Sequence, residues 1–312
     1  MRVKQERQMV ISNQDGLELS LLILIPQTGI RGIVQIHHGM AEHKERYLPF
    51  MEYLAGEGFV AAIHDCRGHG ESVKSLDDLG YTYGVGAQGL VEDTHQITLM
   101  LKQRWPEIPF ILFGHSMGSL VVRSYTKKYD KDLDMLIVCG SPSKRSDVGL
   151  AKKIIAAQGK IFGEHHRCNM IAAMSFGPYA KPFVGEESNY CWCCSDEQVV
   201  AEYEASPLCG FIFTVDGYRT LFGLMEETYS KKGWELNHPE LPILFLGGAQ
   251  DPCIDGARKY AQAVQFLRSL GYKKIKGRLY PGMRHEVLNE KERQMVFCEV
   301  KKYIEKYVGL AD

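Results

Sequence analysis

The sequence has almost no net charge, no apolar run long enough to cross a bilayer and no apolar segment at its beginning. Its 37 lysine and arginine residues balance 38 aspartate and glutamate residues, which leaves a net charge of −1. Without a basic excess the chain lacks the electrostatic footprint of a nucleic-acid-binding protein, so we expect no nucleic-acid partner. The absence of a run of roughly 20 apolar residues and of a leader-like opening predicts a cytoplasmic protein.

Disulfides are not indicated either. The nine cysteines are odd in number, and Cys139 and Cys298 stand within apolar patterns, which favours reduced thiols packed in the interior. The cluster Cys191-Trp-Cys-Cys194 allows a zinc interpretation with Cys168 and its neighbouring histidines as further ligands. Adjacent cysteines are awkward joint ligands of one tetrahedral ion, so we favour buried thiols in this cluster and expect no metal and no cofactor.

One segment combines a buried-strand pattern, a glycine-flanked serine and a helical pattern. Residues 110–113 are the β-branched and aromatic types of a buried strand, and apolar residues recur at helical spacing from Leu120 to Tyr125. Between them lies Gly114-His-Ser-Met-Gly118, the G-x-S-x-G pattern of a nucleophile elbow, where a sharp turn lifts the serine hydroxyl above the sheet. This context predicts that Ser116 is a nucleophile.

A serine nucleophile needs a base, and the base needs a carboxylate that fixes its tautomer. In this type of sheet the chain order is serine, acid, histidine. Asp251 directly follows a buried-strand pattern, and His285, the one histidine beyond it, follows a later strand. Asp255 is the alternative acid. All these residues fall where parallel strands end, which is the edge where open α/β sheets bind ligands.

The tetrahedral intermediate of acyl transfer also needs two preorganised N–H groups that face its oxyanion. The amide of Met117 at the start of the predicted helix is one candidate, because helix N-termini present unsatisfied N–H groups. The loop after the early strand near residues 32–37 supplies the other. There Gly39 permits close backbone approach, and we expect Met40 to be the donor.

Five ordered motifs together resemble the monoacylglycerol lipase and lysophospholipase family of α/β-hydrolases. Within it, the chain resembles the bacterial-type members that are similar to serine aminopeptidase S33. The segment from Ser195 to Thr214 resembles the family's cap, so the likeness spans nearly the whole chain. The motifs are His38-Gly-Met-Ala-Glu-His43 with Arg46-Tyr47, Asp65-Cys-Arg-Gly-His-Gly70, Gly114-His-Ser-Met-Gly118, Gly248-Ala-Gln-Asp-Pro252 and His285-Glu286.

The resemblance implies a hydrolase of carboxylic esters with a long acyl chain and a small polar head. It implies Ser116 as nucleophile, His285 as general base, Asp251 as the residue that orients it, and the amides of Met40 and Met117 as oxyanion hole. It further implies that substrate is bound by Gly39, Glu42, Arg46 and His115, with Glu42 and Arg46 shaping the polar-head pocket. Family members known as monoglyceride hydrolases carry a second histidine where this chain has Leu288, so the exact substrate stays open.

The order of patterns predicts an α/β-hydrolase fold: a mostly parallel sheet that begins with an antiparallel hairpin around Asp15-Gly16. We expect a core of residues 1–140 and 238–312 and an inserted helical cap of residues 141–237. An apolar stripe from Val148 to Phe162 is interpreted as a cap helix packed on the core. The alternative is a lid that guides acyl chains or makes transient contact with a lipid surface.

The remaining patterns leave several alternatives. Residues 84–89 match G-x-G-x-x-G, but without a strand before them or an acid about 20 residues later we interpret them as a loop ahead of a helix over residues 91–104. Asn289 is predicted to cap the last helix. An acyltransferase with the same triad and a non-catalytic ligand-binding relative remain alternatives to the expected hydrolase of a small ester or lipid. The sequence indicates no oligomeric state.

Overall fold

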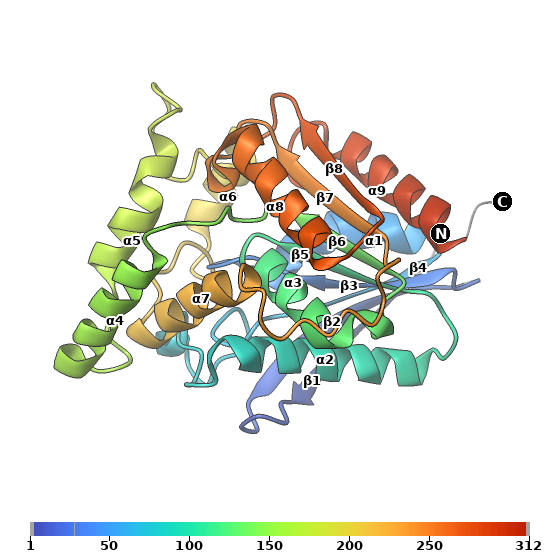
Figure 1. The fold of residues 1–312 in the computed structure, drawn as a ribbon, viewed down its shortest axis with the longest axis horizontal. Helices are drawn as coiled ribbons and strands as arrows, with labels where there is room; N and C mark the ends of the chain where they lie inside the picture. The colour runs from blue at the N-terminus through green and yellow to red at the C-terminus, as the bar shows by residue number, and fades with distance from the viewer. Residues whose placement is uncertain (1–2, 28, 310–312) are drawn as a thin grey trace.

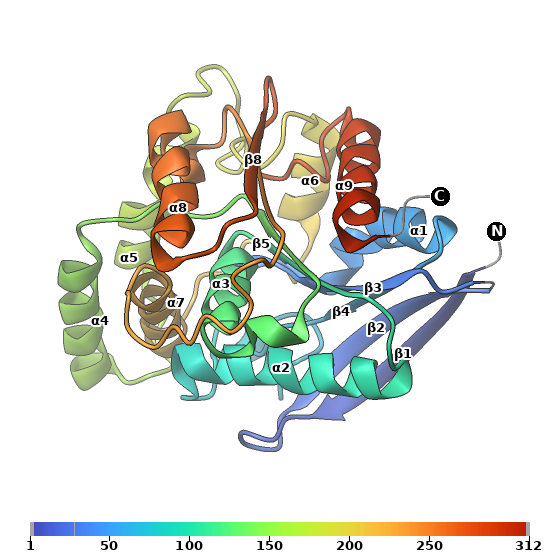
Figure 2. The ribbon, with the colours of Figure 1, turned by 45° about the vertical axis from the view of Figure 1, so that its right-hand side comes forward.

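The computed structural model describes residues 3–27 and 29–309, which form an eight-stranded sheet between two layers of helices (Figures 1 and 2). The strand order is β1-β2-β4-β3-β5-β6-β7-β8. β1 pairs antiparallel with β2 and β2 with β4, and all other pairs are parallel. The strands are Val3–Ile11, Glu18–Pro26, Gly32–His37, Phe59–His64, Phe110–His115, Met135–Cys139, Ile243–Gly248 and Ile275–Tyr280.

This topology confirms the predicted fold class. The hairpin forms where Asp-Gly separates the first two runs, with Gly16 in the left-handed region at φ 77°. Such a backbone is open to glycine and strained for most other residues. The central strands β3 to β7 are buried on both faces, as expected of parallel strands covered by helices on either side.

Helices cover both faces of the sheet. Two of them, α1 and α9, pack on one face with an aromatic cluster in which the ring of Phe50 lies 5.0 Å from that of Phe297 and 5.6 Å from that of Phe113. The other face carries α2, α3 and α8 (Figure 2). The bounds of these five helices are Leu48–Gly56, Arg293–Val308, Gly86–Arg104, Met117–Tyr129 and Gly256–Leu270.

Two local predictions are wrong. The glycine-rich segment 84–89 is not all loop, because α2 already begins at Gly86 and its first turn contains Gly89. Asn289 does not cap the last helix: α9 begins at Arg293 after Glu292, and the Asn289 amide instead donates to the Glu286 carboxylate at 2.9 Å.

Four helices lie between β6 and β7 in the described part of the chain. They are α4 (Val148–Phe162), α5 (Asn169–Phe176), α6 (Glu197–Ala205) and α7 (Val215–Thr228). In Figure 1, α4 and α5 stand at the end of the molecule away from both termini. The division into core and cap stays a prediction, and α7, which it assigns to the cap, packs against α2 and α3 as well as α4.

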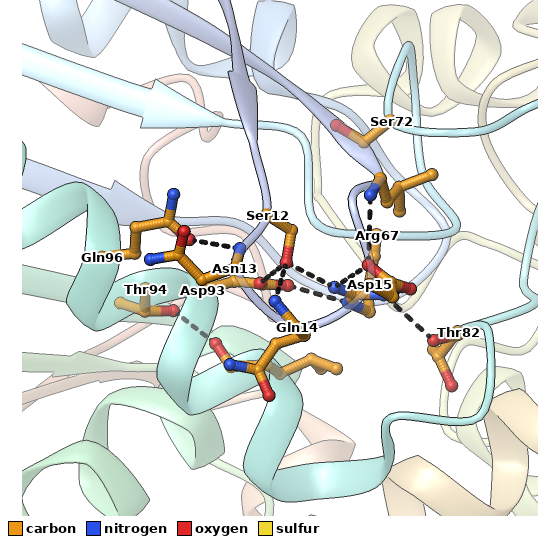
Figure 3. A network of polar contacts seen from close by, with 12 residues as sticks. Ser12, Asn13, Gln14, Asp15, Arg67, Ser72, Thr82, Asp93, Thr94 and Gln96 are labelled. Carbon is orange, nitrogen blue, oxygen red and sulfur yellow. Dashed lines mark hydrogen bonds and ion pairs between the residues drawn. The ribbon is translucent and has the colours of Figure 1, made fainter.

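The turn after β4 braces neighbouring loops (Figure 3). Arg67 is fully buried. Its guanidinium donates to Asp93 of α2 at 2.7 Å, to Asp15 of the hairpin at 2.9 Å and to Ser12 at 3.0 Å. A buried charge of this kind is tolerated because carboxylates and hydrogen bonds surround it. Arg67 thereby ties the hairpin to the loop that follows β4.

Among the described residues, no helix combines the length and the apolar character needed to cross a membrane. The cytoplasmic location stays a prediction from sequence.

Candidate active site

The serine elbow has the predicted geometry. Ser116 stands between the end of β5 and the start of α3 with φ 52° and ψ −118°, a strained backbone for a residue with a side chain. The flanking glycines are required by packing. A Cβ on Gly114 would lie 2.4 Å from the carbonyl oxygen of Gly118, and one on Gly118 would lie 2.2 Å from that of His37. The elbow is therefore locked by the close approach of β5, α3 and the end of β3.

Asp251 and His285 meet at the same edge of the sheet. Asp251 follows β7, His285 follows β8, and their Oδ2 and Nδ1 atoms are 2.8 Å apart. The other carboxylate oxygen accepts the N–H of Cys253 at 2.7 Å, which fixes the plane of the carboxylate. Because a carboxylate only accepts, Nδ1 carries the proton and Nε2 is left with its lone pair. The predicted alternative, Asp255, is exposed in a left-handed conformation ahead of α8.

The charge of this pair sets the basicity of the imidazole. Burial lowers the pKa of His285, but the attraction of the Asp251 carboxylate and its hydrogen bond outweigh that effect and leave the pKa raised. A raised pKa makes the ring a better proton acceptor.

The loop after β3 reaches the serine. A Cβ on Gly39 would lie 3.0 Å from the Cβ of Ser116, so the backbone here passes directly beside the nucleophile. Met40 of this loop and Met117, the first residue of α3, both line the cavity that contains Ser116. The structure therefore brings together the residues predicted to form an oxyanion hole.

Ser116 and His285 open into one cavity of about 290 Å³ that is lined in part by the segment between β6 and β7, the predicted cap. His115 also lines it, with its ring centroid 4.7 Å from that of His285. Its other walls are mainly aromatic and apolar side chains of the cap segment. The aromatic residues among them are Phe176, Tyr179, Tyr190, Trp192, Tyr203, Phe211, Tyr218 and Phe222.

One end of the cavity is acidic. Glu42 and Glu286 both line it, and Arg46 lies behind them, outside the set of lining residues. The Arg46 guanidinium contacts Glu42 at 2.7 Å and both carboxylate oxygens of Glu286 at 2.8 and 2.6 Å. The family resemblance implies that Arg46 binds substrate, which stays a prediction; in the structure its guanidinium is paired with the two carboxylates. A single guanidinium is thus shared by the two carboxylates of this wall.

The same ion cluster organises the loops on either side of the serine. Glu42 accepts the N–H of Gly39 at 2.6 Å and the hydroxyl of Tyr47 at 2.9 Å, so it holds the loop beside Ser116. Burial raises the pKa of Glu42. Burial also acts to raise the pKa of Glu286, but the paired Arg46 guanidinium more than offsets it and lowers that pKa. Sequence reasoning gave Glu286 no role, although it adjoins His285.

A cap segment is hydrogen-bonded to the histidine loop. The N–H of His285 donates to the carbonyl of Trp192 at 3.4 Å, and that of Glu286 donates to the carbonyl of Cys193 at 2.7 Å. The neighbouring Arg284 guanidinium binds the carbonyl of Cys191 at 2.6 Å and the carboxylate of Glu186 at 2.7 Å. These contacts join residues about 90 positions apart, and no pattern in the sequence predicts them.

The thiols of the Cys191–Cys194 cluster are buried. Within residues 3–27 and 29–309, these thiols do not gather with Cys168 into a group of metal-ligand spacing. What the cluster supplies in the structure is mainly backbone carbonyl groups.

A serine on an elbow, backed by an acid and a histidine from later strands of a mostly parallel sheet, is the arrangement of the α/β-hydrolases. Residues 28–292 match the family described as serine aminopeptidase S33, and the chain belongs to this family.

Several distant relatives match over most of the chain. A monoacylglycerol lipase of Mycolicibacterium smegmatis is 26% identical over 93% of each chain. Phospholipase YtpA of Bacillus subtilis is 22% identical over 88% of this chain and 96% of its own. A crystal structure of a thermostable carboxyl esterase from Bacillus coagulans in complex with glycerol superposes with a TM-score of 0.88 over 97% of this chain and 99% of its own, at 24% identity.

Proposed function

We propose that this protein is a serine hydrolase that cleaves carboxylic esters through an acyl-enzyme on Ser116. The observation that carries the proposal is the 2.8 Å contact between His285 and Asp251 at the wall of the cavity that contains Ser116. The family and the names of its relatives support an ester as the substrate.

In the proposed mechanism the Ser116 hydroxyl attacks the ester carbonyl while Nε2 of His285 takes its proton. Asp251 keeps the proton on Nδ1 and stabilises the imidazolium that forms. The amides of Met40 and Met117 hold the oxyanion of the tetrahedral intermediate. His285 then returns the proton to the leaving alcohol, and a water molecule, activated by the same nitrogen, releases the acid from Ser116.

The cavity supports a substrate with a long acyl chain and a small polar head, as in a monoacylglycerol or a lysophospholipid. Its aromatic and apolar cap wall suits an acyl chain. Its acidic end offers carboxylate oxygens of Glu42 and Glu286 as acceptors for head-group hydroxyls. Leu288, which stands where monoglyceride hydrolases of the family carry a second histidine, is buried and does not line the cavity.

The cap also supports transient contact with a lipid surface. Large apolar side chains on α4 and α5 are exposed, and lysines accompany them along α4. Apolar side chains beside cations are typical of helices that lie at the membrane interface. The exposed apolar residues are Leu150, Ile161, Phe162, Met170 and Met174.

The decisive experiment compares the wild type with Ser116→Ala on a panel of p-nitrophenyl esters, monoacylglycerols of graded chain length and lysophospholipids. We expect turnover to peak at medium or long acyl chains and to fall by about 10⁴ to 10⁶ in Ser116→Ala, with the thermal midpoint nearly unchanged. Activity retained by a clean Ser116→Ala preparation would remove the proposed nucleophile. Preferential formation of a new ester when an alcohol is added would identify an acyltransferase instead.

A further inference from the structure

A cysteine stands beside the acid and the histidine. Cys253 belongs to a single 3₁₀ turn, Pro252–Ile254, that begins directly after Asp251. One donor atom each from Asp251, Cys253 and His285 lies within 4.8 Å of the other two, and all three residues are buried. Cys253 and His285 also line the cavity, so a small solute in the cavity can reach them.

The spacing is close to that of a metal site. In tetrahedral zinc sites the metal lies roughly 2.0 to 2.3 Å from nitrogen, oxygen and sulfur, which places the ligand atoms about 3.3 to 3.6 Å from one another. To reach this geometry, the 2.8 Å contact between His285 and Asp251 must open by about 0.5 Å, and the remaining pairs must close by at most about 1.5 Å. Binding of the ion therefore requires the Asp251 and His285 side chains to separate slightly and the Cys253 thiol to turn toward them.

The chemistry of the donors selects the ion. A thiolate, an imidazole and a carboxylate together favour zinc or cadmium, whereas magnesium and calcium prefer oxygen ligands alone. Three protein ligands leave the fourth position of the tetrahedron available to water.

We propose that Asp251, Cys253 and His285 form an inhibitory binding site for a thiophilic divalent ion such as zinc or cadmium. The ion takes the lone pair of Nδ1, so the ring proton moves to Nε2. The Cys253 thiol releases its proton to solvent on becoming a thiolate ligand. With Nε2 protonated, the imidazole has no lone pair left to accept the proton of Ser116. The inhibition rests on the proposed role of His285, whereas binding of the ion does not.

Metal binding is tested without turnover in Ser116→Ala protein, which keeps all three ligands. Titration with cadmium should produce the ultraviolet charge-transfer band of a cadmium–thiolate bond and saturate at one equivalent. Cys253→Ser in the same background should lose the band, whereas Cys193→Ser, which removes another cavity-lining thiol, should keep it. Asp251→Asn tests the site independently if Cys253→Ser does not fold, and should raise the cadmium dissociation constant at least tenfold.

Inhibition is tested in active protein with a chromogenic ester. Zinc should inhibit the wild type and Cys193→Ser alike, a chelator should restore the rate, and magnesium should have no effect. The zinc concentration for half-inhibition, relative to each variant's own metal-free rate, should rise at least tenfold in Cys253→Ser. Equal zinc sensitivity of Cys253→Ser and the wild type, or a cadmium band that survives Cys253→Ser, would overturn the proposal. Failure of the proposed function would appear separately, as turnover by Ser116→Ala.

Discussion

Replacing Asp251 by asparagine tests whether the carboxylate of Asp251 fixes the tautomer of His285. The Oδ2 atom of Asp251 accepts the Nδ1 proton of His285 at 2.8 Å, and Oδ1 accepts the N–H of Cys253 at 2.7 Å. In the Asp251→Asn variant, an amide that keeps its oxygen on Cys253 turns its NH₂ group toward Nδ1. Nδ1 must then accept, so the ring proton moves to Nε2 and the base toward Ser116 is lost.

The expected loss can be put as a number. A wrong tautomer in a serine triad lowers kcat by about 10⁴, or about 5.4 kcal/mol at 1.36 kcal/mol for each factor of ten. Because Asp251 is not among the residues that line the cavity, KM should change little. The fold should persist, since the amide oxygen preserves the contact with Cys253.

Steady-state kinetics on one soluble ester, with circular dichroism to verify folding, suffice as the assay. Asp255→Asn is the matched control: it lies four residues along, is exposed, and occupies a left-handed conformation that asparagine tolerates. Its kcat should stay within about twofold of the wild type, as for surface substitutions remote from a site. A folded Asp251→Asn enzyme that keeps more than a tenth of kcat, or an Asp255→Asn enzyme equally impaired, would refute the assignment.

Three further predictions concern the surroundings of the site. Arg46→Gln removes the cation between two buried carboxylates and should lower the free energy of unfolding by about 3 to 5 kcal/mol. An unchanged urea midpoint would contradict a stabilising role for the ion cluster of Arg46, Glu42 and Glu286. Gly39→Ala places a Cβ 3.0 Å from that of Ser116 and should displace the loop that carries the proposed oxyanion donor. Loss of one such donor lowers kcat by about 10² or more, which steady-state kinetics would measure. Wild-type turnover by a folded variant would argue against an oxyanion hole in this loop. Burial lowers the pKa of His37 and of His69 to about 4 each. Because these rings are neutral when folded and protonate near pH 6.5 when unfolded, the free energy of unfolding should be highest above pH 6.5 and fall as the pH drops toward 4; flat urea midpoints across that range would contradict this.

Local patterns in the sequence are sufficient to predict the fold class. Strand and helix periodicity and the Asp-Gly turn are each determined by neighbours in the chain, and each reappears in the structure. The errors at Gly86 and Asn289 are also local. Glycine lowers helix propensity but does not forbid a first helical turn, and the Asn289 side chain is occupied by Glu286.

The parts of the site that sequence could not predict depend on distant pairs. The contact between Arg46 and Glu286 joins positions 240 apart, and a charged residue in one sequence does not show whether it faces substrate or an ion partner. Likewise, nothing in Cys191-Trp-Cys-Cys194 shows that its carbonyl groups and the Cys194 thiol bind the loop that carries His285. Such features arise only when two separate loops are packed together.

The carbonyl contacts from Trp192 and Cys193 bear on any attempt to shorten the protein. Removal of the whole insertion would delete the acceptors for two main-chain N–H groups of the loop that carries His285. It would also strip one wall from the cavity and leave Arg284 without its carbonyl partner at Cys191. A variant without residues 141–237 would therefore not simply have a more open cavity, because it would also lose contacts that hold the loop of His285. In this chain the segment that lines the cavity also holds the loop that carries His285.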